Sequence, residues 1–384
     1  MSSFWEKIRR DFPLTRSGLY LDHAAGGPLA EPVRIRMQEA LRENALEADF
    51  AWPRWMKRAE RCRAAAAKFI HAEPEEIAFV SSTSQAVNAA AEMLAGEGSV
   101  LTNVCEFPSS TLPWIWRKAK IFYQKPRAGG ILALEDLQRQ LRPEVKTIVT
   151  SSVQYATGFR QDLEALGQMK GRRYLVVNAT QSLGAVPFNV KACNADIVCS
   201  NSYKWLMAGY GGGLMYIRSE ILRKFKPASI GWRSVKDPDA MKNRKTAIRS
   251  EAARYEMGVP GFPAIFAVGA AIEYLMDIGI EKIFRRILEL SAYAAERLED
   301  RGFRVLSPRE ERFRSGIVIA EMNAAVRVWK RLLARGVFVS PRGGGLRIGP
   351  HFYNTPEEID RLVEILSACR DEESRNSGRK GVKK

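Results

Sequence analysis

The sequence predicts an α/β protein: a large domain with a mostly parallel sheet covered by helices, followed by a smaller α+β C-terminal domain. Three observations support this fold class. Short apolar runs alternate with helical patterns over the first part of the chain, as in sheets built from strand–helix–strand units. The chain has 384 residues, enough for two to three domains of about 150 residues each. After a long apolar helical run at 262–278, helices and strands follow in a different order.

The strands expected in the large domain are short and apolar. They occupy residues 76–80, 99–103, 121–123, 147–151, 174–178, 197–200 and 213–217. Apolar residues at helical spacing predict helices before and between these strands. These helices occupy residues 31–44, 55–71, 86–94, 133–141 and 162–168.

The helix 262–278 is expected to connect the two domains. The elements expected after it are a helix at 283–301, strands at 302–306, 315–319 and 337–339, and a closing helix at 355–368. Thr355 and Glu358 have the spacing of a capping box at the start of that last helix.

The large domain is expected to span residues 15–260 and the small domain 261–370, with residues 1–14 packing nearby. The segment 374–384 holds five cations, no acid and almost no apolar residue, so it is predicted to be a disordered basic tail.

The formal net charge is +17, and the arginines are spread along the chain, as on solvated helix faces. No nucleic-acid-binding motif accompanies the charge, so attraction of anionic substrates or cofactors is favoured over nucleic-acid binding. DNA binding by the basic tail is kept as an alternative.

The five cysteines form no CxxC pair, which disfavours a zinc ribbon or a disulfide framework, and no metal site is expected. The charged start MSSFWEKIRRDF and the lack of a long apolar run predict a cytoplasmic protein without a membrane span.

Two segments that follow predicted strands suggest an anionic ligand. The run 81–85, SSTSQ, precedes a helix, where backbone N–H groups and hydroxyls can bind an anion; plain helix capping is the alternative. Asn178 ends another strand, where open α/β sheets bind ligands, or it organises a turn.

Two further segments carry a cation that could be functional. Lys204 lies among aromatic residues after a strand, where partial desolvation would favour a neutral amine and Schiff-base chemistry; a solvated lysine is the alternative. Arg347 follows three glycines and could clamp a carboxylate, or it lies at the surface beside a glycine-rich turn. The run GYGGG at 209–213 lacks the lysine of a nucleotide-binding loop and is interpreted as a turn.

Taken in order, eight motifs between about residues 20 and 366 resemble the class V aminotransferase family of pyridoxal-phosphate enzymes, which includes cysteine desulfurase-like and isopenicillin-N-epimerase-like proteins. The motifs are YLDHAAGGPL, EFPSSTLPW, VQYATGFRQDL, NATQSLGA, SYKWL, GWRSV, RYEMG and LRIGPHFYNTPEEID. The resemblance implies the fold-type-I architecture, a homodimer and pyridoxal 5′-phosphate as cofactor.

The resemblance also implies roles for individual residues. Lys204 matches the catalytic lysine that binds the cofactor covalently, and Arg347 matches the arginine that holds the substrate carboxylate. The other cofactor-binding positions that match are Thr83, Ser84, Asn201 and Tyr203 near the phosphate, Phe107 on the ring face, Asn178 at the ring nitrogen, and Gln181 with Gln154 or Tyr155 near the phenolic oxygen.

Three departures from the family pattern affect the expected chemistry. Asn178 stands where the family usually has aspartate, so the ring nitrogen should be less basic. Val259 replaces a threonine that reaches the partner subunit's phosphate. The stretch VFVSPRGGGLRI lacks the desulfurase cysteine, and Cys369 lies beyond it, so a persulfide-forming desulfurase is disfavoured.

The expected function is therefore transfer of the amino group of a small amino acid, with Lys204 also moving the α-proton. Elimination or C–S lysis is the first alternative and racemisation the second. A non-catalytic binding protein that keeps the fold is an alternative from another class.

Overall fold

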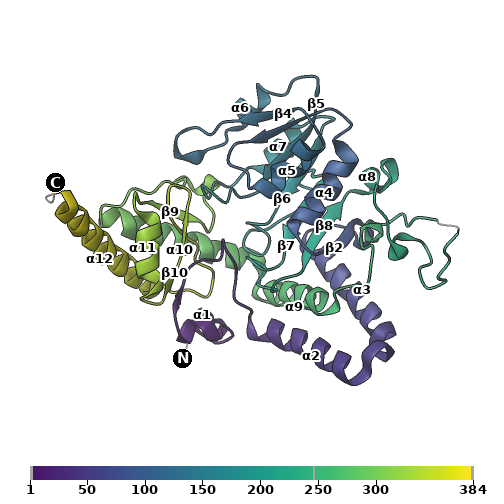
Figure 1. The fold of residues 1–384 in the computed structure, drawn as a ribbon, viewed down its shortest axis with the longest axis horizontal. Helices are drawn as coiled ribbons and strands as arrows, with labels where there is room; N and C mark the ends of the chain where they lie inside the picture. The colour runs from purple at the N-terminus through teal and green to yellow at the C-terminus, as the bar shows by residue number, and fades with distance from the viewer. Residues whose placement is uncertain (1–2, 245–246, 382–384) are drawn as a thin grey trace.

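The computed structural model describes residues 3–244 and 247–381, which form two lobes (Figure 1). The larger lobe is built around a seven-stranded sheet of order β2-β8-β7-β6-β5-β3-β4. Its strands are β2 (Ile77–Val80), β3 (Ser99–Asn103), β4 (Ile121–Gln124), β5 (Val145–Ser151), β6 (Tyr174–Asn178), β7 (Ile197–Asn201) and β8 (Gly213–Ile217). All neighbours pair in parallel except β8, which is antiparallel to both β2 and β7. The predicted mostly parallel sheet is confirmed.

Both faces of this sheet are buried, because alternate residues of each strand point to opposite faces. In β6, Val176 belongs to one apolar core, whereas its neighbours Leu175 and Val177 belong to the other. Helices cover the sheet on both sides (Figure 1). They are α2 (Glu31–Glu47), α3 (Trp52–Phe69), α4 (Thr83–Leu94), α5 (Pro108–Trp116), α6 (Leu134–Gln138), α7 (Leu163–Met169), α8 (Ser219–Lys224) and α9 (Phe262–Ile278).

The smaller lobe contains two small sheets and three helices. One sheet is antiparallel, of order β11-β12-β9, and in the other β1 pairs in parallel with β10. The elements are β1 (Leu19–Tyr20), β9 (Val318–Glu321), β10 (Val337–Phe338), β11 (Ser340–Arg342), β12 (Gly345–Ile348), α10 (Ile280–Asp300), α11 (Ala325–Leu333) and α12 (Pro356–Gly381). The predicted capping box of α12 is present, with Thr355 and Glu358 bonding each other's backbone N–H.

The core of the large lobe extends past residue 261, into α9 and the first part of α10. Helix α9, placed by the sequence at the start of the small domain, packs against α2 and α3 beside the large sheet (Figure 1). Along α10, Ile287 belongs to the core of the large lobe and Leu290 to that of the small lobe. An apolar helix looks the same in sequence whichever lobe buries it, so the pattern could not assign α9.

The N-terminal helix α1 (Phe4–Arg9) packs close to the small lobe. The Arg9 guanidinium donates two hydrogen bonds to the Glu358 carboxylate at the start of α12. The apolar side chains of α1, Trp5 and Ile8, pack against the core of the large lobe. Residues 1–2 lie outside the described residues.

Two expectations for the small lobe were wrong. The segment 302–306 forms only an isolated bridge, Val305 to Ala320, instead of a strand. The helix α12 runs to Gly381, through most of the tail predicted to be disordered, and residues 382–384 lie outside the described part. Adding residues to an existing helix costs far less than nucleating one, and arginine and lysine are good helix formers, so the backbone can continue as a helix.

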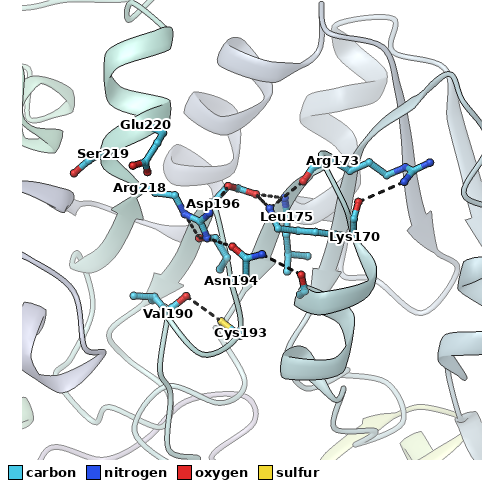
Figure 2. Close-up of polar contacts among 12 residues, drawn as sticks. Lys170, Arg173, Leu175, Val190, Cys193, Asn194, Asp196, Arg218, Ser219 and Glu220 are labelled. Atoms are coloured by element: carbon cyan, nitrogen blue, oxygen red, sulfur yellow. Dashed lines mark hydrogen bonds and ion pairs between the residues drawn. The ribbon is translucent and has the colours of Figure 1, made fainter.

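The amino edge of the parallel strands holds a buried ion pair (Figure 2). The Lys170 ammonium donates to the Asp196 carboxylate over 2.7 Å, and the two side chains are 5% and 6% exposed. Asp196 also accepts the Leu175 backbone N–H, and the Arg218 guanidinium lies 3.4 Å away. The cluster ties together the starts of β6 and β7 and the end of β8, opposite the edge where polar residues end the strands.

No single helix in the described residues is long and apolar enough to cross a membrane. The pair α9 and α10 meets that criterion only together, with an 80° bend between them. Nor do His, Cys, Asp or Glu side chains in the described part gather in a group of three that could hold a metal ion.

Candidate active site

A cavity of about 110 Å³ lies at the carboxyl edge of the large sheet. Strands β5, β6 and β7 end there at Ser151, Asn178 and Asn201, and the N-terminus of α4 faces the same space. Ligands bind at this edge in open α/β sheets. The lining residues are Ser82, Thr83, Ser84, Phe107, Ser109, Ser151, Tyr155, Asn178, Thr180, Gln181, Asn201, Tyr203 and Lys204.

Lys204 lies in the turn after β7, and its amine is well suited to act as a nucleophile. The Nζ atom lies 5.9 Å from the ring centres of both Phe107 and Tyr203. It makes no hydrogen bond or ion pair with the residues that the structure describes. Burial, followed by the charge of Arg347, lowers the pKa of Lys204 to about 7, although Asp22 opposes this shift. A large fraction of the amine is therefore unprotonated at neutral pH.

The backbone of Lys204 is held by a close approach of the N-terminal segment. The Gly27 N–H donates to the Tyr203 carbonyl over 2.7 Å. A Cβ atom at Gly27 would lie 2.3 Å from the Lys204 carbonyl oxygen, so only glycine fits without a shift of the backbone.

Gly27→Ala should therefore displace Lys204. We expect the free energy of unfolding to fall by about 1–3 kcal/mol, as for overpacked sites. We also expect less covalent labelling of Lys204 by the predicted cofactor. Urea unfolding and mass spectrometry measure the two effects. Gly96→Ala is the control, because nothing lies within 4 Å of its added Cβ. Equal behaviour of the two variants would contradict this role of Gly27.

One end of the cavity can bind an anion. Thr83 and Ser84 are the first two residues of α4, whose backbone N–H groups have no acceptor within the helix. The Thr83 hydroxyl lies 2.7 Å from that of Thr180. Across the cavity, Asn201 is 6% exposed, and its amide nitrogen can donate a hydrogen bond. Tyr203 lies beside it. A phosphate would find hydroxyl, amide and backbone donors here.

The Asn178 amide is fixed by two protein contacts. Its oxygen accepts the Thr180 backbone N–H at 3.0 Å, and its nitrogen donates to the Ser110 hydroxyl at 2.9 Å. The oxygen is thus engaged, and the amide group has one N–H left to donate. The site therefore offers a neutral group, not a carboxylate, at this position.

Gln181 links the cavity wall to two other segments. Its amide donates to the Ala24 carbonyl and accepts from the Trp205 indole N–H, next to Lys204. Gln154, by contrast, does not line the cavity; its amide donates to Glu106 over 2.7 Å, and its neighbour Tyr155 lines the cavity instead. The other predicted cofactor-binding residues all line this cavity.

Glu106 is a buried carboxylate that the sequence predictions missed. It accepts hydrogen bonds from the Ser151 backbone and hydroxyl, at 2.5 and 2.6 Å, and from Asn103 and Gln154. These contacts fix the loop that presents the Phe107 ring to the cavity. The available signal was the position of Glu106 next to Phe107 in the motif EFPSS.

Arg347 lies on β12 and is 4% exposed. Its guanidinium donates to the Tyr155 carbonyl over 3.3 Å and lies 3.7 Å from the Asp22 carboxylate. Its Nε atom is buried and has no partner among the described residues. A buried guanidinium with an unused donor is suited to a carboxylate ligand. The sequence predicted this role for Arg347 but not its contact with Asp22.

The sequence profile of the family Aminotransferase class-V matches residues 19–362. The chain belongs to the aminotransferase class-V family. It is 27% identical over 369 residues to the uncharacterized aminotransferase YcbU of Bacillus subtilis (strain 168), covering 94% of this chain and 97% of YcbU. It is also 27% identical, over 398 residues, to a probable cysteine desulfurase of Pyrococcus abyssi (strain GE5 / Orsay), covering 94% and 96% of the two chains.

The fold agrees with this membership of the aminotransferase class-V family. The apo structure of a cysteine desulfurase from Thermococcus onnurineus NA1 superimposes with a TM-score of 0.87 at 24% identity, covering 97% of this chain and 99% of the desulfurase. The predicted family and the fold-type-I class are both confirmed.

Two departures from the class-V pattern can be located in the structure. Val259 is 69% exposed and lines a different cavity from that of Lys204. None of the five cysteines lines the Lys204 cavity, and Cys369 is buried in the core of the small lobe. The structure thus offers no thiol next to Lys204.

Proposed function

We propose that this class-V enzyme acts on a small amino acid with Lys204 as the residue that carries the cofactor, and that its reaction is amino-group transfer. Its cofactor is pyridoxal 5′-phosphate, the cofactor of the family. The observation that carries the proposal is the Lys204 amine, which lies in the cavity without a partner among the described residues and has a pKa of about 7.

The lining residues fit the parts of this cofactor. Thr83, Ser84 and Asn201 would hold its phosphate, and the Phe107 ring would cover one face of the pyridine. Gln181 would donate its free N–H near the phenolic oxygen. When bound, the cofactor supplies an electron sink for bonds at the α-carbon of the substrate.

Arg347 and Lys204 have separate roles toward the substrate. Arg347 would fix the substrate carboxylate with paired hydrogen bonds, which orients the α-carbon. The Lys204 amine would take up the α-proton of the substrate and return it. A pKa near neutrality suits both directions of this proton transfer.

Asn178→Asp is expected to change the electronic state of the bound cofactor. A carboxylate at this position can still accept the Thr180 N–H and would favour a protonated ring nitrogen. We expect a shift in visible absorbance and a rise of about tenfold in exchange of the α-proton with deuterated water, equivalent to about 1.4 kcal/mol.

The matched control for Asn178→Asp is Asn194→Asp, an amide whose oxygen accepts from Arg218 at the opposite edge of the sheet. If Asn178→Asp leaves both absorbance and exchange rate unchanged, this amide does not set the chemistry of the ring.

The test of the proposed reaction is incubation of the loaded enzyme with single amino acids in the absence of a keto acid. Transfer converts the cofactor to its amine form and releases one keto acid per site. Pyruvate or sulfide in repeated turnovers would show elimination instead, and the mirror-image amino acid would show racemisation. An unchanged cofactor and no product from any amino acid would contradict an enzymatic function and favour a binding protein.

We further propose a homodimer, as the resemblance implies. Val259 and Tyr210 are apolar, 69% and 75% exposed, and Tyr210 stacks on Tyr203 at the cavity. A partner subunit would cover such residues. The mass of the loaded enzyme in solution, measured by light scattering, tests this; a monomer would contradict it.

A further inference from the structure

The hairpin that carries Arg347 also carries a second arginine on the same face. Strand β11 pairs with β12 in antiparallel register, Ser340 opposite Arg347 and Arg342 opposite Gly345. Paired residues, and residues two apart on one strand, share a face of the sheet. Ser340, Arg342 and Arg347 therefore lie on one face.

That face is turned toward Asp22. The Ser340 hydroxyl donates to the Asp22 carboxylate, and the Arg347 guanidinium lies 3.7 Å from the other carboxylate oxygen. Arg342 is close enough for its charge to contribute, after burial and Arg347, to lowering the pKa of Lys204. Burial raises the pKa of Asp22, and the charge of the exposed Arg342 is among the nearby groups that oppose this shift.

Arg342 has no acidic partner of its own. Its guanidinium donates to the Pro341 carbonyl over 2.9 Å, and it forms no ion pair with any residue in the described part of the chain. Arg347, by contrast, lies 3.7 Å from the Asp22 carboxylate. The positive charge of Arg342 is available to a ligand.

We propose that Arg342 determines specificity by binding a second anionic group of the substrate, so that the site selects amino and keto acids with two carboxylates. The proposal rests on the proposed function and names its substrate class. Arg347 would hold the α-carboxylate, and Arg342 the carboxylate at the far end. Diagonal neighbours in an antiparallel pair lie about 7–8 Å apart, and flexible arginine side chains can adjust that spacing to a short dicarboxylate.

The test compares the binding of succinate and propionate by titration calorimetry, on the full chain with and without pyridoxal phosphate. The wild type should bind succinate at least tenfold more tightly, because a charge-assisted hydrogen bond to Arg342 is added. Arg342→Met should remove this preference and leave propionate binding unchanged. Arg304→Met is the matched control, an exposed arginine of the same lobe that pairs with Glu321, and it should keep the preference.

Three results would overturn the proposal: equal affinity of the wild type for the two acids, no measurable binding of succinate, or an equal loss of both affinities in Arg342→Met. The last would mean that Arg342 only contributes to a general positive field. Because neither acid carries an amino group, this measurement does not depend on Lys204 chemistry, so its failure is distinguishable from failure of the proposed amino-group transfer.

Discussion

Arg347→Met is expected to raise the KM for the amino-acid substrate by two to three orders of magnitude. Removing one partner of a buried, hydrogen-bonded charge pair costs about 2–5 kcal/mol, and here the substrate carboxylate would lose its main contact. The guanidinium is 4% exposed and its buried Nε is unused, so little water could take its place. Steady-state kinetics with a series of substrate concentrations measures the change.

Arg347→Lys is the informative companion variant. It keeps the positive charge and the attraction to Asp22 but loses the planar guanidinium, which can donate two hydrogen bonds to one carboxylate. The KM should therefore rise less than in Arg347→Met. Visible absorbance of the bound cofactor should be present in both variants, which shows that the fold and the cofactor site remain. If Arg347→Met loads normally and its KM stays within threefold of the wild type, another residue binds the carboxylate.

Asp196→Ala is expected to give the largest loss of stability, about 3–5 kcal/mol in the free energy of unfolding. The substitution leaves the Lys170 ammonium buried without its partner and also removes the acceptor of the Leu175 N–H (Figure 2). Urea unfolding followed by far-ultraviolet circular dichroism measures the loss.

Two variants separate the buried charge from other causes. The double substitution Lys170→Met with Asp196→Leu removes both charges and should recover the part of the stability lost to the unpaired Lys170 charge, because paired apolar residues can replace a buried ion pair. It should not recover the part due to the Leu175 N–H, which still lacks its acceptor. Glu220→Ala breaks an exposed pair with Arg223 nearby and should cost less than about 1 kcal/mol. A loss in Asp196→Ala no larger than in Glu220→Ala would contradict a structural role for this cluster.

The sequence predicted the large sheet well because its strands are buried on both faces. Such strands are short continuous apolar runs, and β6 was predicted with the bounds that the structure shows, Tyr174–Asn178. The residues that end these strands, among them Asn178 and Asn201, could be predicted to lie together because parallel strands bring their carboxyl ends to one edge.

The parts of the candidate site that the sequence did not predict depend on contacts between segments that are distant in the chain. Glu106 binds Ser151 and Gln154, more than forty residues away, and Asp22 meets Arg347 and Ser340 from the opposite end of the chain. No local pattern marks such partners. The strand β12 was not predicted, because the glycines before it conceal the alternation that marks a strand.

The most direct test of the account is borohydride reduction of the loaded enzyme, followed by peptide mapping. We expect the cofactor to be fixed irreversibly on Lys204, and capture of added cofactor by the unloaded chain to become faster as the pH rises through about 7, where the Lys204 amine loses its proton. Lys170, a buried lysine already paired with Asp196, should remain unlabelled. A chain saturated with cofactor whose Lys204 peptide carries no label would contradict the account.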